Sequence, residues 1–318
     1  MVKNILVVGG AGYIGGFLVD QLNDANFNTT VYDNLLYEKQ YFKDVEFING
    51  DIRDTNKLIN LIKIKKFDII IWLAALVGDG ACAINEKITY DINVNSLKDF
   101  IENYRGKIIF LSTCSVYGQS THIIDEDGEK KPQSIYAKSK IEAEKIISKH
   151  DDFTIIRLGT LFGLGDKFSR IRLDLVVNLL TLKACKKEKI SVYGGDQFRP
   201  LLHVKDVATG ILHIIKNKIN GIYNLSYMNF KILDLALSIK NRFDYPLDLA
   251  IQDLPFEDTR NYSVSNQRIL DTGWKPKFKL EDGIDELKKI FIEERIKDTS
   301  DEVFSNAVFL KKIKYDSY

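Results

Sequence analysis

The sequence has few of the residues on which disulfide-rich and metal-binding proteins depend. Its 318 residues include three cysteines, Cys82, Cys114 and Cys185, and four histidines, all of them scattered along the chain. An odd number of widely spaced cysteines excludes a disulfide framework, and neither residue type is arranged in a metal-ligand pattern. We therefore expect a cytoplasmic protein of a reducing compartment, without a metal site.

An excess of charge of one sign is also missing. Lys plus Arg number 45 and Asp plus Glu number 44, which gives a formal net charge of +1. Such a balance creates no field that attracts nucleic acid or an anionic membrane. No apolar run reaches the about 18 residues that suggest a membrane-spanning helix, and residues 5–8 are too few for a signal-peptide core. We expect neither a nucleic-acid partner nor a membrane partner.

The first half of the chain alternates short β-branched runs with longer segments of helical period. This alternation is typical of an α/β fold with a doubly wound parallel sheet. Continuously apolar runs, as burial on both faces requires, predict most of the strands. We expect strands at residues 3–8, 29–32, 45–48, 68–73, 107–111 and 153–158, and helices at residues 13–25, 55–63, 88–104 and 134–149.

The pattern changes after residue 158, where a smaller second lobe is expected to begin. Its first elements are a glycine-rich loop at 159–170, a helix at 173–185 and a short strand at 190–193. A helix at 204–217 and a strand at 221–225 are expected to return to the first lobe. We therefore predict a domain of residues 1–158 and an interleaved substrate-binding lobe of residues 159–318, in which residues 296–318 carry no functional prediction.

A glycine-rich segment joins the first expected strand to the first expected helix. It fits the spacing GxxGxxG and, from Gly10, also GxGxxG. Glycines there permit a tight turn and let backbone N–H groups approach a pyrophosphate at the helix N-terminus. The pattern predicts a dinucleotide site in a domain of Rossmann type. Its residues are Gly9, Gly12, Tyr13, Ile14 and Gly15.

Asp33 ends the second expected strand, 18 residues after Gly15. A carboxylate at this place accepts hydrogen bonds from the ribose hydroxyls of NAD and repels the 2′-phosphate of NADP. Asn34, Leu35 and Leu36, which follow it, add no positive charge, so we predict that the cofactor is NAD. Asp51 and Ile52 are expected beside its adenine. An ordinary turn role remains the alternative for Asp33 and Asp51.

Tyr136 and Lys140 lie one turn apart on an expected helix. A neighbouring ammonium favours a phenolate, so Lys140 is expected to lower the pKa of Tyr136 and make it a general base. The same spacing recurs at Tyr227. Position favours Tyr136, because Thr113 ends the fifth strand, at the edge where a doubly wound sheet binds its ligands. The hydroxyl of Thr113 either holds the reacting oxygen or merely closes the strand.

In these motifs the chain resembles the extended short-chain dehydrogenase/reductases of the NAD-dependent epimerase/dehydratase family, which act on nucleotide-diphosphate sugars. The resemblance runs from residue 1 to about residue 287. Besides the residues above, it rests on Leu73-Ala74-Ala75, Asn93-Val94, residues 157–163 and 194–207, and Arg260 before Gly273-Trp274-Lys275-Pro276.

The resemblance implies a role for each matching residue. Tyr136 would be the acid/base catalyst, Lys140 its electrostatic partner and a ligand of the nicotinamide ribose, and Thr113 the hydroxyl that completes the proton network. Hydride would pass between the nicotinamide and the sugar, usually its C4. Further residues implied in the cofactor site are Leu73, Ala74, Ala75 and Asn93.

For the second lobe the resemblance implies a substrate site. The family holds the substrate's diphosphate with a loop matching residues 157–163 and with arginines matching Arg199 and Arg260, whose forked guanidinium suits phosphate. Thr160 stands where many members have Asn, so no preference for uridine is implied. Further candidates for phosphate or sugar contacts are Arg170, Arg172 and Asn178, and Asp79 either contacts the sugar or caps a helix.

The residues after Thr113 separate the reactions of the family. Its 4,6-dehydratases have an acid there, whereas this chain has Cys114 and Ser115, which disfavours dehydration. Members that form GDP-fucose pair a Cys with a His after the sixth strand, and this chain has no His between His150 and His203. Cys114 is therefore expected to be a small buried thiol.

We predict NAD-dependent oxidation at C4 of a GDP-heptose or GDP-hexose to the 4-keto sugar, for bacterial surface-polysaccharide precursors. Residues 74–82 and 112–118 resemble such 4-dehydrogenases more than they resemble uridine-sugar 4-epimerases. A 4-epimerase with a transient 4-ketone is the alternative, and a non-catalytic NAD-sensing regulator is a remote one, because fold alone does not fix function. The resemblance also implies a homodimer formed through the helices at 88–104 and 134–149.

Overall fold

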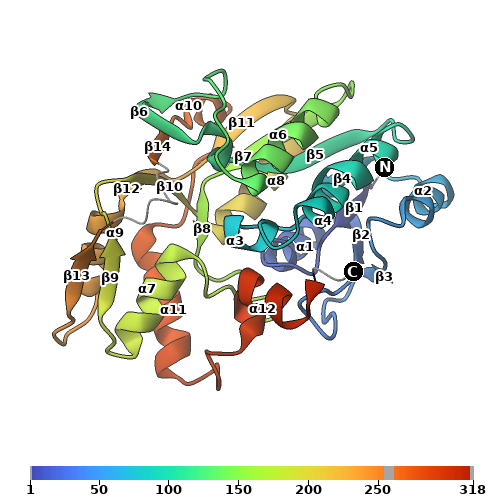
Figure 1. Cartoon of the computed structure of the whole chain (residues 1–318). Coiled ribbons are helices and arrows are strands. Elements are labelled where there is room, and N and C mark those ends of the chain that lie inside the picture. Colours follow the sequence, from blue (N-terminus) through green and yellow to red (C-terminus); the bar gives the residue numbers. More distant parts are fainter. Residues whose placement is uncertain (1, 254–260, 316–318) are drawn as a thin grey trace.

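The computed structural model describes residues 2–253 and 261–315. Its centre is a seven-stranded parallel sheet with the strand order β11-β7-β5-β4-β1-β2-β3. Helices cover both faces of this sheet (Figure 1). The Rossmann-type doubly wound α/β fold expected from the sequence is therefore confirmed.

The strands at the middle of the sheet are almost completely buried, as their continuously apolar sequences predict. The seven strands are β1 (Asn4–Val8), β2 (Asn28–Asp33), β3 (Glu46–Asn49), β4 (Ile69–Trp72), β5 (Lys107–Thr113), β7 (Phe153–Leu158) and β11 (Gly221–Leu225). Helices that cover them include α1 (Gly15–Asp24), α2 (Thr55–Ile64), α6 (Ile135–Ile147), α8 (Val204–Asn217) and α10 (Gln267–Leu270).

The single helix expected at residues 88–104 is divided into three segments: α4 (Glu86–Tyr90), a π-helical turn (Asp91–Asn95) and α5 (Ser96–Ile101). The helix begins earlier than expected because the side chain of Asn85 accepts a hydrogen bond from the backbone N–H of Ile88, at 3.0 Å. The π turn carries Asn93, whose amide binds both backbone groups of Leu76, at 2.8 and 3.0 Å. An extra residue in one helical turn leaves no clear mark on sequence periodicity.

The second lobe contains three small sheets, β12-β10-β8, β13-β9 and β14-β6. Their strands are β6 (Gln119–Ile124), β8 (Thr160–Phe162), β9 (Ile190–Tyr193), β10 (Phe198–His203), β12 (Met228–Lys231), β13 (Leu249–Gln252) and β14 (Asn261–Val264). The helices are α7 (Val176–Cys185), α9 (Ile232–Lys240) and α11 (Leu280–Ile292). The expectation of a continuous loop at 159–170 is wrong, because β8 pairs there with β10.

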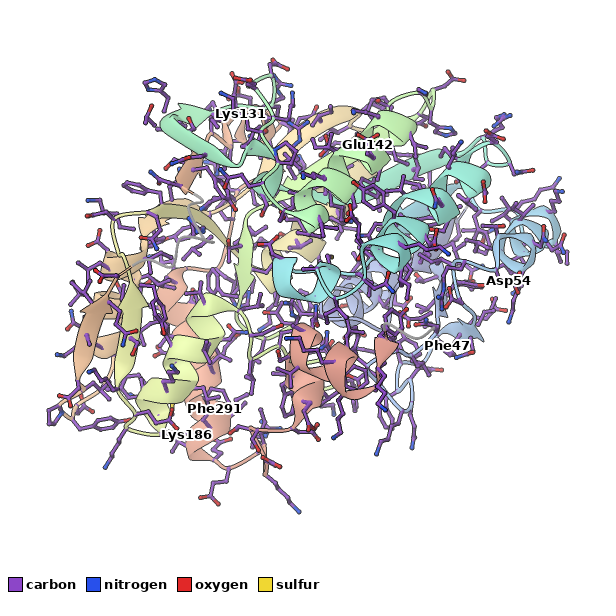
Figure 2. All side chains as sticks on the ribbon, viewed as in Figure 1. Phe47, Asp54, Lys131, Glu142, Lys186 and Phe291 are labelled. Atoms are coloured by element: carbon purple, nitrogen blue, oxygen red, sulfur yellow. The ribbon has the colours of Figure 1, made fainter. Side chains whose placement is uncertain are left out.

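Residues 204–225 lie with the first lobe. α8 packs beside α1, and β11 extends the central sheet by pairing with β7. Exposed charged side chains such as Lys131 and Lys186 point outward at opposite ends of the molecule (Figure 2). In the described ranges, no helix combines the length and the apolar character that crossing a membrane requires.

The strand order places a ligand site between β1 and β4. The chain runs from β1 to β2 and β3 on one side, then crosses to β4 on the other side. Doubly wound sheets bind ligands outside the carboxyl ends of the strands at such a switch point. The two loops touch there, because a Cβ on Gly9, at φ +85°, would lie 2.5 Å from the backbone nitrogen of Ala74. Only glycine fits this approach.

Candidate active site

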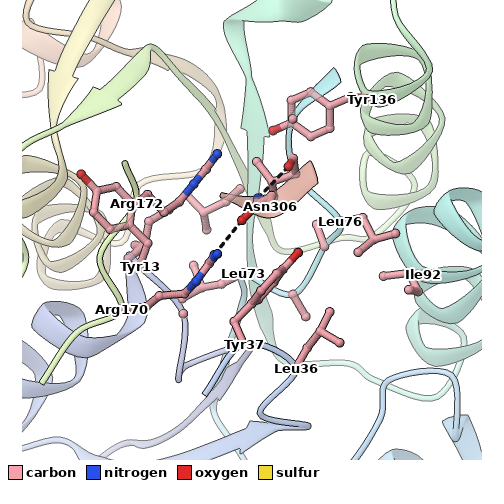
Figure 3. A pocket seen from close by; sticks show the side chains of 18 of the residues that line it. Tyr13, Leu36, Tyr37, Leu73, Leu76, Ile92, Tyr136, Arg170, Arg172 and Asn306 are labelled. Carbon is pink, nitrogen blue, oxygen red and sulfur yellow. Dashed lines mark hydrogen bonds between the residues drawn. The ribbon is translucent and has the colours of Figure 1, made fainter. Parts of the chain in front are cut away.

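A pocket opens at this switch point, with residues of both lobes in its walls (Figure 3). Most of the cofactor residues predicted from the sequence line it: Gly9, Gly12, Tyr13, Ile14, Asp33, Asn34, Asp51, Ile52, Leu73, Ala74, Ala75, Tyr136 and Lys140. Thr113 and Thr160 line it too. Gly15 and Asn93 do not, because Gly15 packs against Gly10 and Asn93 holds the backbone of Leu76.

The glycine turn has the shape that a dinucleotide pyrophosphate needs. A Cβ on Gly15 would lie 2.2 Å from the carbonyl oxygen of Gly10, so α1 begins tightly against the turn. A Cβ on Gly12 would meet the oxygen of Gly9 at 3.5 Å and nothing closer, so the space above Gly12 is open. The first turn of α1 has no side-chain cap, which leaves its N–H groups for an anionic ligand.

Asp33 lies at the end of β2 with its carboxylate fixed by backbone donors. Its oxygens accept hydrogen bonds from the N–H of Leu35 at 2.7 Å and the N–H of Ala11 at 3.0 Å. Burial raises the pKa of Asp33, and these hydrogen bonds act against that rise. A carboxylate held beside the glycine turn fits the ribose hydroxyls of NAD and opposes a 2′-phosphate. These residues therefore fit NAD.

Tyr136 lies beside a chain of hydroxyl groups at the end of β5. The hydroxyl of Thr113 is close enough to oppose the effect of burial on the pKa of Tyr136. Thr113 Oγ1 donates to Ser115 Oγ at 3.1 Å, and Ser115 Oγ lies 3.2 Å from the hydroxyl of Tyr262. Such a chain can relay or orient a proton at the phenol oxygen. The structure thus brings together two residues predicted to act on the same proton.

In this structure the pKa of Tyr136 is raised by burial, whereas the sequence predicts that Lys140 lowers it. The buried ammonium of Lys140 donates to the carbonyl oxygen of Leu111 at 2.8 Å and lies 4.7 Å from the ring centre of Phe110. Burial raises the pKa of Tyr136 and lowers the pKa of Lys140 to about 8. Desolvation disfavours the charged form of each group, which raises the pKa of the phenol and lowers the pKa of the ammonium.

Cys114 is completely buried, as expected. Its thiol donates to the carbonyl oxygen of Arg157 at 3.2 Å, and burial raises its pKa. The guanidinium of Arg157 is also buried, paired with Glu144 at 2.7 Å, so it does not line the pocket. The residue that follows Thr113 therefore supplies no acid to the pocket.

The predicted substrate residues are divided by the structure. Thr160 lines the pocket, whereas Asn178 does not: its amide accepts from the N–H of Gly163 at 3.0 Å and donates to the carbonyl oxygen of Arg172 at 2.8 Å. Arg199 lies outside the lining, with its guanidinium 5.6 Å from the ring centre of Tyr262. Arg260 lies outside the described residues.

Several lining residues were not assigned to the site from the sequence. They include Leu35, Leu36, Tyr37, Glu38, Val77, Gly78, Ser115, Leu175, Tyr262, Asn306 and Tyr315. Arg170 and Arg172, which were candidates, line the pocket as well. The residues after Asp33 could have been inferred from their place beyond β2. No motif marks Asn306 and Tyr315, which reach the pocket through tertiary packing.

The chain matches known proteins along most of its length. Residues 5–226 match the model of the NAD dependent epimerase/dehydratase family. A putative UDP-glucose 4-epimerase of Methanocaldococcus jannaschii is 29% identical over 296 residues, covering 88% of this chain and 95% of that protein. The dTDP-D-glucose 4,6-dehydratase of Bos taurus is 28% identical over 323 residues, covering 89% of this chain and 86% of that protein.

The fold is also similar to solved structures. The UDP-glucose 4-epimerase of Thermus thermophilus, solved in complex with NAD, has a TM-score of 0.80 and 22% identity, covering 91% of this chain and 99% of that one. At this identity the similarity shows the fold. The family model spans more than half of the chain, and the glycine turn and Asp33 fit the cofactor that it names. The protein is therefore an NAD-dependent enzyme and belongs to the NAD dependent epimerase/dehydratase family.

Proposed function

We propose that the protein is a nucleotide-sugar 4-epimerase, which oxidises C4 of the sugar to a ketone and reduces it again from the opposite face. The similarity to a putative UDP-glucose 4-epimerase supports this reaction better than the net 4-dehydrogenase predicted from the sequence. The sequence predicts this 4-epimerase as the alternative to net oxidation. A nucleotide-diphosphate sugar is the substrate class that the relatives favour.

The proposed chemistry centres on Tyr136. Bound NAD supplies the acceptor and the donor of the C4 hydride. In its phenolate form Tyr136 takes the proton of the C4 hydroxyl during oxidation, and as the phenol it returns that proton during reduction, so the residue ends each cycle as the phenolate with which it began. Thr113, which acts on the pKa of Tyr136 and lines the same pocket, orients that proton. The guanidinium of Arg172 opposes the effect of burial on the pKa of Tyr136.

The observation that carries the choice among family reactions is the pair of residues after Thr113. A 4,6-dehydratase of the family has an acid at that place. Because one relative of this chain is a dTDP-D-glucose 4,6-dehydratase, dehydration has to be weighed against epimerisation. Cys114 is buried with its thiol on the carbonyl oxygen of Arg157, and Ser115 is a hydroxyl in the chain from Thr113. Neither can move protons at C5 and C6 as a carboxylic acid does. C4 chemistry alone is therefore proposed.

The finer features of the substrate and assembly stay proposals from the sequence. A GDP-heptose or GDP-hexose, and a role in bacterial surface-polysaccharide synthesis, are the substrate and the setting predicted there. Arg199, Arg260 and Asn178 remain proposed for substrate binding, and Thr160 lies where it can contact the sugar nucleotide. A homodimer would pair α5 and α6, which pack side by side, with the same helices of a second copy. Light scattering of the purified protein tests that assembly.

The function is tested with a panel of UDP-, GDP-, CDP- and dTDP-linked sugars, including heptoses, and NAD. The epimerase proposal predicts a C4 epimer in the product mixture with no lasting rise in the near-ultraviolet absorbance of reduced nicotinamide. A sustained rise, stoichiometric with a 4-keto sugar, would establish the dehydrogenase instead. Turnover that survives Tyr136→Phe would exclude the proposed acid/base residue.

A further inference from the structure

The C-terminal segment lies across the cofactor pocket. We call residues 302–315 the C-terminal clasp; it contains a 3₁₀ turn (Glu302–Phe304) and α12 (Asn306–Lys312). Figure 1 shows α12 between the second lobe and α3 (Asp79–Cys82) of the first lobe, and α12 and α3 are in contact. Asn306 and Tyr315 line the pocket and are 3% and 5% exposed.

Asn306 joins the two lobes through three hydrogen bonds. Its side-chain amide donates to the carbonyl oxygen of Val77, just beyond β4, at 2.8 Å. Its side-chain oxygen accepts from Arg170 of the second lobe at 2.7 Å, and its backbone N–H donates to Asp174 at 2.9 Å. Val77 and Arg170 line the pocket together with Asn306. One residue of the clasp therefore fixes both walls of the pocket.

Arg170 is the residue that the clasp holds in place. Its guanidinium lies 3.7 Å from the ring centre of Tyr37 and also donates to the carbonyl oxygen of Val303, at 2.8 Å. Arg170 is 6% exposed, yet in the described part of the chain its Nε and the hydroxyl of Tyr37 have no hydrogen-bond partner. Buried donors without partners are rare. Asp174 and Glu38 act on Arg170 electrostatically, but among the described residues its guanidinium forms no ion pair with a carboxylate, and such a guanidinium suits a phosphate. Figure 3 shows Arg170, Tyr37 and Asn306 together on one wall.

The clasp continues toward the far end of the pocket. The ring of Phe309 packs on Tyr37, with ring centres 5.1 Å apart. Tyr315 lies near enough to Asp51 and Arg53 to interact electrostatically with both, and Asp51 is the residue expected beside adenine. The clasp therefore follows the pocket from Val77, beside the switch point, to the expected adenine end.

We propose that the C-terminal clasp retains NAD, with Asn306 holding Arg170 so that its unpartnered Nε binds a phosphate of the cofactor. The inference rests on the proposed function in one respect: a 4-epimerase must keep its reduced cofactor until the hydride returns to C4, whereas a net dehydrogenase has no such requirement. Retention of the cofactor is measured without any sugar, so it can be tested separately from the reaction.

The test compares Asn306→Ala with Val308→Ala in the full-length protein carrying NAD. Val308 lies on the same helix and is 48% exposed, so its truncation disturbs neither the pocket nor the clasp contacts. The NAD content after gel filtration and the rate at which labelled NAD is displaced by unlabelled NAD are measured. Asn306→Ala removes the hydrogen bond that Asn306 accepts from the charged guanidinium of Arg170. This variant is therefore expected to release NAD about tenfold faster or more. Val308→Ala should behave as the unchanged protein.

A second variant keeps the test decisive if Asn306→Ala folds poorly. Arg170→Lys keeps the positive charge and removes the Nε donor, and it should also accelerate NAD release. Circular dichroism with saturating NAD checks that each variant is folded. Unchanged NAD release in folded Asn306→Ala or Arg170→Lys would overturn the clasp. If the variants release NAD faster but the unchanged protein epimerises no sugar in the panel, the role of the clasp in retaining NAD is supported and the proposed epimerase function is contradicted.

Discussion

The ammonium of Lys140 donates to the backbone carbonyl oxygen of Leu111 at a distance of 2.8 Å. This bond ties α6 to the end of β5, close to the residues proposed to exchange protons. Lys140 is 3% exposed, and burial lowers its pKa to about 8. The lysine is thus a buried charge in the wall of the cofactor pocket, and its titration should be measurable.

The first prediction concerns the pH dependence of stability. In the folded protein without cofactor Lys140 loses its proton near pH 8, whereas in the unfolded chain it does so near the ordinary value of about 10.5. The unfolded state binds more protons between these values, so this group makes stability rise with pH there, by up to about 1.4 kcal/mol per pH unit. Urea unfolding of Lys140→Met should lack that rise. Parallel pH profiles for the two proteins would contradict the buried lysine.

The second prediction concerns the acid/base residue. Tyr136→Phe removes the phenol oxygen and should lower turnover by about 10²- to 10⁴-fold, with NAD still bound. Tyr227→Phe is the matched control, because Tyr227 has the same spacing to a lysine but lies outside the pocket. Turnover and NAD content are measured for both. Loss of activity in the control with retention in Tyr136→Phe would reverse the assignment.

The third prediction concerns the buried ion pair beneath the site. Glu144 accepts from Arg157 at 2.7 Å and from Ser112, and the two charged side chains are 7% and 1% exposed. Glu144→Gln leaves Arg157 buried without a full counter-charge and should lower the free energy of unfolding by about 3 kcal/mol. Glu142→Gln, on the same helix in an exposed pair with Lys145, should cost less than about 1 kcal/mol. Equal losses in urea unfolding would contradict this contrast.

The fourth prediction concerns cofactor choice. Asp33→Ala removes the carboxylate expected on the ribose and should weaken NAD binding by about ten- to a hundredfold. It should also reduce the discrimination against NADP, because the like charge that opposes a 2′-phosphate is gone. Calorimetric titrations with both cofactors measure this. An unchanged NAD affinity would return Asp33 to the ordinary turn role.

The sequence could predict those parts of the structure that local pattern determines. The glycine turn, Asp33 and the buried strands each leave a mark within a few residues, and the first-lobe elements follow from them. β8 is three residues long and forms only because β10 pairs with it. The sequence did not predict the π turn at Asn93. The side-chain amide of Asn93 accepts a hydrogen bond from the backbone N–H of Leu76, and this contact exists only in the folded structure.

The site was predictable to a similar extent. Tyr136 and Thr113 could be inferred from their places on two elements, and both line the same pocket. The hydrogen bond of Lys140 to the Leu111 carbonyl could not, because the two groups meet only in the folded state. Asn306 is 136 residues from Arg170 in the chain, and no spacing rule links the two.

The most direct test of the proposed reaction uses the active nucleotide sugar with deuterium at C4. An epimerase that returns the same hydride should give a C4 epimer that keeps its deuterium, as mass spectrometry and NMR measure, without accumulation of free reduced nicotinamide. Deuterium found on released reduced cofactor, together with an equal amount of 4-keto sugar, would contradict the epimerase and show net oxidation at C4.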